Sequence, residues 1–140
     1  MAESPPGWAR EFVASARAGR MATSSAESEP HVIPICFVLL DDTIYSVIDE
    51  KPKSGRRLLR LRNIDQTGQA ALVVDHYDED WSQLAFVLLR GPAQTIPGNS
   101  TALAALREKY PQYLDMSLDR AEMVELRVKR WTAWRSTETP

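Results

Sequence analysis

The sequence predicts a mainly β domain in which antiparallel strands form a closed or partly closed barrel with helices at its periphery. Six segments rich in β-branched and aromatic residues are separated by turn residues. Helical apolar spacing occurs at the start, in the middle and before the final strand. A chain of 140 residues can build one core but not two, so we expect a single domain over residues 1–140. Barrel closure is expected because it removes exposed strand edges.

The first part of the chain predicts a helix within residues 1–18 and then three strands. Pro5 and Pro6 can open the helix, because a first-turn residue needs no N–H. Pro34 cannot donate a hydrogen bond to a sheet, so it indicates a bulge, an edge strand, or backbone turned toward a ligand. The three strands are expected at residues 19–25, 31–40 and 43–49.

The second part predicts two helices and three further strands, which complete a barrel over residues 19–134. Leu58, Leu61 and Ile64 recur at helical spacing, and the Gly91-Pro92 pair indicates a bend inside a long strand. Asn99 or Ser100 can cap the last helix, which Pro111 ends. The helices are expected at residues 54–65 and 100–110, and the strands at 69–77, 81–96 and 124–128.

Composition excludes several classes of protein. The chain has 17 Lys and Arg against 19 Asp and Glu, so its net charge of -2 favours neither nucleic acid nor an anionic membrane. With one cysteine, Cys36, and two distant histidines, His31 and His76, no structural metal site is expected. No apolar run reaches the length of a membrane span and no signal peptide is evident, so a cytoplasmic location is expected.

A basic segment precedes and enters the middle helix. Free N–H groups and the helix dipole bind anions at such a place, so the segment is a candidate phosphate site. Charge runs more often form a solvated helix face, and the residues by themselves leave both interpretations open. The six basic residues are Lys51, Lys53, Arg56, Arg57, Arg60 and Arg62.

The polar segment from Asp75 to Trp81 could cover a flat ring by stacking, or could be only an acidic hairpin turn. Taken alone, His76 is more typical of a hydrogen-bonded structural residue. Cys36 is more typical of a buried residue with no catalytic role. The chain has no glycine-rich phosphate loop, nucleophile elbow or paired-histidine motif. An enzyme built on this sequence would therefore need a bound cofactor for the difficult chemistry.

Four segments together resemble one family, the pyridoxamine-phosphate-oxidase-like proteins, and within it the probable deazaflavin (coenzyme F420)-dependent oxidoreductases. The segments are Gly19–Thr23, Pro30–Phe37, Asp49–Lys53 with Leu61–Ile64, and Asp75–Trp81. The resemblance implies a six-stranded antiparallel split β-barrel of the FMN-binding type with peripheral helices. It also implies a homodimer whose two cofactor sites lie at the subunit interface.

The resemblance assigns site residues by position. Lys53 and Arg57 would hold the cofactor phosphate, and Asn63 would order the helix end. His76 and Trp81 would close over the ring from the facing subunit. Strand backbone would meet the ring at Ile33, Pro34, Ile35, Cys36, Ser46, Val47 and Ile48.

The implied reaction is hydride transfer between coenzyme F420 and an unsaturated small molecule. Tyr45 and His76 are the candidate proton donors. Two alternatives stay open: the same fold could use riboflavin phosphate (FMN), or the protein could bind a flavin, deazaflavin or haem-like ligand without turnover.

Overall fold

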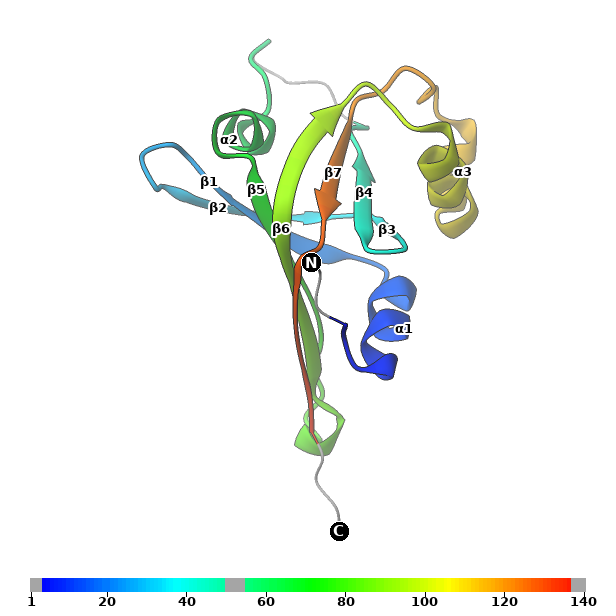
Figure 1. The fold of residues 1–140 in the computed structure, drawn as a ribbon. Coiled ribbons are helices and arrows are strands. Elements are labelled where there is room, and N and C mark those ends of the chain that lie inside the picture. Colours follow the sequence, from blue (N-terminus) through cyan, green and yellow to red (C-terminus); the bar gives the residue numbers. More distant parts are fainter. Residues whose placement is uncertain (1–3, 50–54, 137–140) are drawn as a thin grey trace.

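The computed structural model describes residues 4–49 and 55–136, which form one curled antiparallel sheet with three α-helices around it (Figure 1). The mainly β fold with peripheral helices is therefore confirmed. The helices are α1 (Gly7–Ser15), α2 (Leu59–Thr67) and α3 (Ser100–Lys109). The strands are β1 (Gly19–Ser24), β2 (Pro30–Ile35), β3 (Val38–Leu40), β4 (Thr43–Val47), β5 (Gln69–His76), β6 (Ala85–Ile96), β7 (Met123–Arg127) and β8 (Arg130–Arg135).

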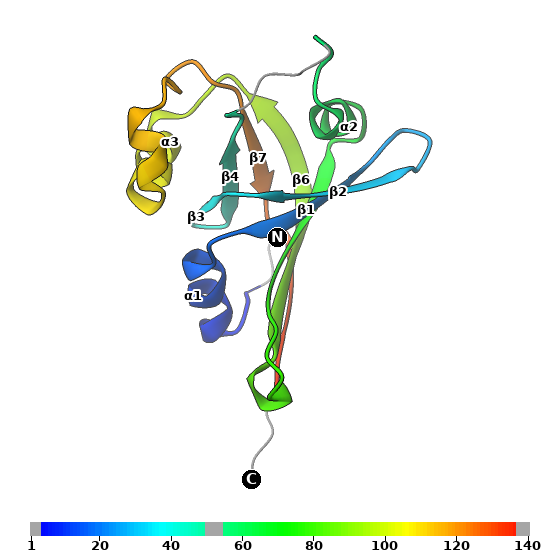
Figure 2. The same ribbon diagram turned by 180° about the vertical axis from the view of Figure 1, so that it is seen from behind.

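The sheet curls because its two outer strands follow one another in the chain. Its order is β2-β1-β5-β6-β7-β4-β3, and β8 pairs with the first half of β6. Only Cys36 and Phe37 separate β2 from β3, so the two ends of the sheet are tied together (Figure 2). The strands β5, β6 and β8 continue beyond the curl as an arm, whose tip is the 3-10 turn Trp81–Gln83.

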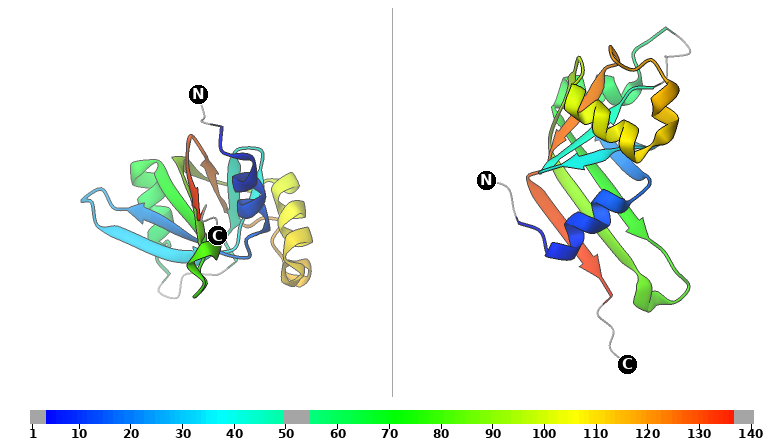
Figure 3. Two further views of the ribbon diagram at one scale, coloured as in Figure 1. Left: turned by 90° about the horizontal axis from the view of Figure 1, so that it is seen from below. Right: turned by 90° about the vertical axis from the view of Figure 1, so that its right-hand side faces the viewer.

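Two apolar clusters fill the fold, one inside the curl and one under α3. The first includes Met21, Phe37 and Leu72, all at most 1% exposed, and α1 and α2 add residues to it. The second joins α3 to β4 and β7 through residues such as Leu106 and Met123. Figure 3 shows the three helices at separate places around the sheet, which matches this division.

The helix boundaries follow local chemistry. The Asn99 side chain accepts a hydrogen bond from the Ala102 N–H at 2.9 Å, so the predicted cap of α3 is confirmed. The helix α2 ends at Gly68, whose φ of 69° is left-handed and favours glycine. This helix begins at Leu59 instead of residue 54, and the predicted cap Ser54 lies outside the described residues.

The described residues contain eight strands, not the predicted six. The expected strand 31–40 divides in two, because the N–H of Phe37 bonds to the Tyr110 hydroxyl at 3.2 Å instead of to a strand. Only Val128 and Lys129 separate the missed strand β8 from β7, and neither is a residue typical of turns. Trp81 does not begin a strand: the Asp80 carboxylate accepts from the Ser82 N–H at 3.1 Å and starts the 3-10 turn.

Gly91 lies at the place where β6 changes partners. Before it, β6 pairs with β8, and from Ala93 onward it pairs with β7. A Cβ atom at residue 91 would lie 1.9 Å from the Arg127 carbonyl oxygen and 3.0 Å from the Arg127 carbonyl carbon. The predicted bend at Gly91-Pro92 is thus a close backbone crossing that excludes every other residue.

We predict that Gly91→Ala lowers the free energy of unfolding by at least about 2 kcal/mol, because the new methyl group forces backbone apart at the crossing. Urea denaturation followed by circular dichroism measures the change. Gly7→Ala is the control, since a Cβ at Gly7 meets nothing within 4 Å and its effect should stay within about 1 kcal/mol. If the two variants were equally stable, the close approach of the Gly91 and Arg127 backbones would be contradicted.

Candidate functional site

A pocket of about 310 Å³ gathers residues from β2, β4 and the turn after α3. Five of the residues that the sequence predicts for the cofactor site line it: Pro34, Ile35, Cys36, Ser46 and Val47. Ala18, Asp49, Arg60 and Tyr113 complete the lining. Its volume lies at the low end for small-molecule sites, so it suits one part of a cofactor, such as a ring, better than a whole extended molecule.

The position of Pro34 explains why a proline is tolerated beside the pocket. It lies in β2, an outer strand of the sheet order, and pairs with Arg20 of β1. A missing N–H on the open side of an edge strand breaks no ladder hydrogen bond. Of the three possibilities that the sequence left open for Pro34, the edge strand is the one observed.

Tyr113 and Asp49 form a hydrogen-bonded pair in the pocket. The Tyr113 hydroxyl donates to the Asp49 carboxylate at 3.1 Å, and Tyr113 is only 6% exposed. Burial, and then the Asp49 charge, raises the pKa of Tyr113 well above its usual value. The phenol therefore stays protonated at neutral pH and acts as a fixed hydrogen-bond donor that orients Asp49.

Behind the pocket, Tyr110 secures the corner between β2 and β3. Its hydroxyl accepts from the Phe37 N–H, and the carbonyl oxygens of Arg17 and Phe37 lie 3.1 and 3.2 Å away as acceptors. The Lys109 ammonium also donates to the Phe37 carbonyl oxygen at 2.9 Å and lies over the Phe37 ring. Burial lowers the pKa of Lys109 to about 8, so a fraction of this amine is neutral at mildly alkaline pH.

Arg57, a predicted phosphate-binding residue, is held by two carboxylates. Its guanidinium bonds to Asp65 at 2.7 Å and to Glu122 at 2.7 and 2.9 Å. Hydrogen bonds to Glu122 and Asp65 raise its pKa above the usual range. A phosphate at Arg57 would have to compete with these partners. Lys53, the other predicted phosphate-binding residue, lies outside the described residues.

Three further predicted residues contact the core, not the pocket. Ile33 and Ile48 are partly buried, pack against the cluster inside the curl and do not line the pocket. Asn63 is 2% exposed, and its amide donates to the Thr23 hydroxyl at 3.1 Å. That contact joins α2 to β1, and the Asn63 carbonyl accepts from Thr67 in the last turn of the helix.

His76 and Trp81 lie at the tip of the arm, at or near the end of β5. Trp81 is 67% exposed, and the nearest acidic group to the His76 imidazole is Asp78 at 3.9 Å. Neither lines the pocket of its own chain. Their predicted contact with the ring would have to come from a facing subunit, and it stays a prediction.

Tyr45, a candidate proton donor, also lies outside the pocket lining, and its hydroxyl donates to Glu125 at 3.3 Å. Asp49, Arg60 and Tyr113 were not assigned to the site by the sequence, although Asp49 and Arg60 lie in segments that it singled out. Tyr113 follows α3 and carried no local signal, because only folding brings it beside Asp49.

Within the described ranges, no group of three or more His, Cys, Asp or Glu side chains could hold a metal ion. Over the same ranges, no helix has the length and apolar character needed to cross a membrane.

Comparisons with known proteins give a consistent result. The family model described as pyridoxamine 5'-phosphate oxidase matches residues 7–135. The 5a,11a-dehydrotetracycline/5a,11a-dehydrooxytetracycline reductase of Streptomyces rimosus is 28% identical over 117 residues, which are 83% of this chain and 72% of that protein.

Two solved structures share the fold. The conserved hypothetical protein Rv2991 from Mycobacterium tuberculosis has a TM-score of 0.75 at 16% identity, covering 97% of this chain and 88% of that one. An FAD binding protein from Mycobacterium smegmatis has a TM-score of 0.60 at 20% identity, covering 93% of each chain.

We predict that Tyr110→Phe lowers the free energy of unfolding by about 1–3 kcal/mol, because the buried Phe37 N–H loses its acceptor. Tyr45→Phe removes the same hydroxyl from a less buried pair and should cost less than about 1 kcal/mol. Thermal and urea denaturation of both variants give the comparison. A smaller loss for Tyr110→Phe than for Tyr45→Phe would show that the β2–β3 corner does not depend on this hydroxyl.

Proposed function

Because the chain belongs to the pyridoxamine 5'-phosphate oxidase family, we propose that it is an oxidoreductase that transfers hydride between coenzyme F420 and an unsaturated small molecule. The observation that carries the proposal is the pocket between β2 and β4. Five residues that the sequence predicts for the cofactor site line it, although they come from two separate segments of the chain. FMN is the alternative cofactor of the same site.

The pocket fits a flat, mostly neutral ring. Strand backbone and small side chains such as Cys36 and Ser46 form much of its lining. The Asp49 carboxylate offers hydrogen-bond acceptors and the Arg60 guanidinium offers donors, which suits a ring that carries both N–H and C=O groups. Tyr113 keeps the carboxylate in place. When bound, the cofactor would supply the hydride, while these residues bind and orient it.

The reductase relative supports the choice of reaction. Its name specifies dehydrotetracycline substrates and a reductase activity, and it spans most of this chain. A carbon–carbon double bond conjugated to a carbonyl group accepts hydride at carbon and then needs one proton. Water or a pocket side chain would supply that proton. The phenol that lines the pocket is that of Tyr113, not that of the candidate donor Tyr45. Because the pKa of Tyr113 is raised, we assign it the role of positioning Asp49 and not that of a proton donor.

The basic segment would bind the anionic tail of the cofactor. Arg60, a residue of this segment that lies in the first turn of α2, lines the pocket and supports this assignment. The tail of coenzyme F420 is longer and more anionic than that of FMN, so it can use more of the positive charges. Because Asp65 and Glu122 neutralise much of the Arg57 charge, we expect Lys53 to contribute more affinity than Arg57.

A second copy of the chain would complete the site. The outer face of β5, β6 and β8 presents Val73, Phe86, Leu88 and Trp134 in neighbouring register positions. Trp134 is 47% exposed and stacks on Phe86 at 6.1 Å. Apolar sheet faces of this kind commonly bind another protein chain. A two-fold dimer through this face would also supply His76 and Trp81 from a facing arm.

The cofactor assignment predicts that the ligand-free protein binds coenzyme F420 roughly tenfold more tightly than FMN at low salt, because two or three extra charge contacts of about 0.2–1 kcal/mol each are available. Tryptophan fluorescence titrations at several salt concentrations measure both affinities, and the preference should shrink as salt rises. Reduced coenzyme F420 should then support reduction of a cyclic enone.

Lys53→Ala should weaken coenzyme F420 binding and leave turnover near normal at saturating cofactor, since the tail is remote from the reacting carbon. Lys129→Ala, in the connection between β7 and β8 and outside the pocket lining, is the matched control. Equal or tighter binding of FMN at every salt concentration would overturn the F420 assignment. Tight binding without turnover of an enone and quinone panel would instead indicate a binding protein.

The subunit arrangement predicts that Leu88→Glu converts a dimer into a monomer, because a charge would be buried at the centre of the proposed interface. Leu114→Glu makes the same change at a 62% exposed residue of another surface and should leave the dimer intact. Light scattering at micromolar concentration gives the masses. The monomeric variant should also bind cofactor more weakly; a monomeric wild-type protein would refute the arrangement.

A further inference from the structure

Arg57 connects α2, the end of β6 and the loop before β7, although it does not line the candidate cofactor pocket. Its Nε donates to the Asp65 carboxylate of α2 at 2.7 Å. Its Nη1 and Nη2 donate to the two oxygens of the Glu122 carboxylate at 2.9 and 2.7 Å. Nη2 also donates to the Thr95 hydroxyl of β6 at 3.3 Å. Each guanidinium nitrogen therefore has a carboxylate partner within the protein itself.

The geometry of this network is of a kind that holds neighbouring segments in place. Isolated surface ion pairs contribute little, but a bidentate arginine–carboxylate contact within a network of charges is stronger and directional. The Thr95 hydroxyl donates in turn to Asp65 at 3.2 Å, which closes a ring of contacts with Arg57. The side chains of Arg57 and Glu122 are only 36% and 34% exposed, so water screens their contact in part.

The loop that carries Glu122 also fixes the end of β4. The Glu122 carbonyl oxygen accepts from the Ile48 N–H at 2.9 Å, one residue beyond the end of the β4–β7 ladder. Val47 and Asp49, the residues on either side of Ile48, both line the pocket. The position of this side of the lining therefore depends on the position of Glu122.

Another side of the lining is carried by α2. Arg60, in the first turn of α2, lines the pocket, and Asp65 of the same helix is a partner of Arg57. Figure 1 shows the ends of β6 and β7 between α2 and β4, so separate elements carry Arg60 and Asp49. The Arg57 network crosses these strand ends and links the two elements.

We propose that Arg57 is a positioning residue of the cofactor site, which sets the spacing between Arg60 and Asp49 and does not bind the cofactor phosphate. The inference rests on the proposed function in that the ring of a flavin or deazaflavin occupies the pocket. The Asp49 carboxylate and the Arg60 guanidinium then meet different polar groups of that ring, and their spacing determines whether both contacts form. Loss of the network weakens the binding of the ring itself, with or without a phosphate attached.

Ligands that share a ring and differ in the phosphate separate the two roles: FMN with riboflavin, and coenzyme F420 with the same deazaflavin lacking its phosphate tail. For the ring that the wild-type protein binds, fluorescence titration of Arg57→Gln should show about three- to tenfold weaker binding of both ligands, because the ring contacts are misplaced. A phosphate-binding Arg57 would instead weaken only the ligand with the phosphate. Lys53→Ala removes a charge from the same basic segment and is the control, since it should affect only that ligand.

Two further variants test the network directly. Arg57→Lys keeps a charge that can bind phosphate, but an ammonium cannot hold two carboxylates as a guanidinium does, so affinity for the phosphate-free ligand should not be restored. Glu122→Ala removes the bidentate partner and should weaken the phosphate-free ligand about as much as Arg57→Gln does. If Arg57 were a phosphate ligand, Glu122→Ala would release it and tighten binding of the phosphate-bearing ligand alone.

The bound ring gives a spectroscopic readout. In Arg57→Gln and Glu122→Ala the visible absorption band of the bound phosphate-free ligand should shift, because Asp49 and Arg60 meet the ring at a changed spacing. An unchanged band would mean that Arg57 only stabilises the fold, and would overturn the proposal.

A ligand-free measurement separates this inference from the cofactor assignment. Cys36 is the only cysteine of the chain and lines the pocket, so its reaction with the uncharged reagent dithiodipyridine reports how open the pocket is. The rate should rise about threefold or more in Arg57→Gln and Glu122→Ala, because the lining opens more often without the network. It should stay unchanged in Arg127→Gln, which removes the same charge from an exposed residue of β7 outside the lining.

Failure of the proposed function and failure of this inference give different results. A wild-type protein that bound none of the four ligands would refute the proposed function, and the Cys36 labelling rates would still decide the role of Arg57. Equal labelling rates in the wild-type and Arg57→Gln proteins, or weaker binding confined to the phosphate-bearing ligand, would overturn the positioning role.

Discussion

The crossing of β6 over the end of β7 is the constraint on which the rest of the fold depends. Gly91 lets the backbone of β6 pass close to the Arg127 carbonyl, and a side chain there would collide with it. Because β6 passes this point, its first half can pair with β5 and β8 and its second half with β7. The sheet therefore curls around the core at one end and extends as an arm at the other.

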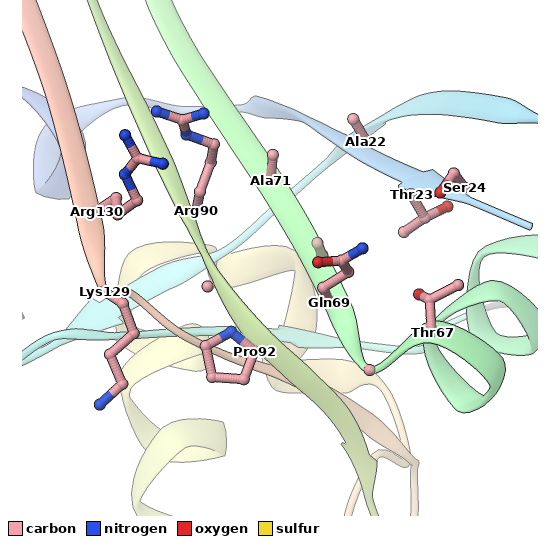
Figure 4. Close-up of a pocket in the computed structure, with 13 residues that line it drawn as sticks. Ala22, Thr23, Ser24, Thr67, Gln69, Ala71, Arg90, Pro92, Lys129 and Arg130 are labelled. Carbon is pink, nitrogen blue, oxygen red and sulfur yellow. The ribbon is translucent and has the colours of Figure 1, made fainter. Parts of the chain in front are cut away.

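Both concave sites arise where this sheet departs from regular pairing. A second concave site, of about 700 Å³, surrounds the crossing itself, where Arg90 and Gly91 meet the connection between β7 and β8 (Figure 4). The cofactor pocket lies at the other departure, the corner at Phe37, where the Tyr110 hydroxyl replaces a strand as hydrogen-bond partner. Irregular backbone leaves space that paired strands would fill, and polar groups can enter that space.

The charges are distributed unequally between the two sites. In the segment before α2, Arg57 is already paired with Asp65 and Glu122, so it joins the helix to the loop before β7 as well as contributing positive potential. At the second concave site, Arg90 and Arg130 are cross-strand partners in β6 and β8. The ion pairs of Arg57 stabilise the contact between α2 and the loop before β7.

The sequence by itself determined the family, the mainly β fold, the three helices and the two strand segments that line the cofactor pocket, because alternation, caps and short motifs are local. It did not separate β3 from β2, since Val38 continues the same apolar run and the division depends on Tyr110, 73 residues from Phe37. It also missed Tyr113, whose partner Asp49 is 64 residues away. Only the tertiary structure decided these contacts and the opposition of Arg90 and Arg130, because the curl of the sheet brings together residues that no local pattern relates.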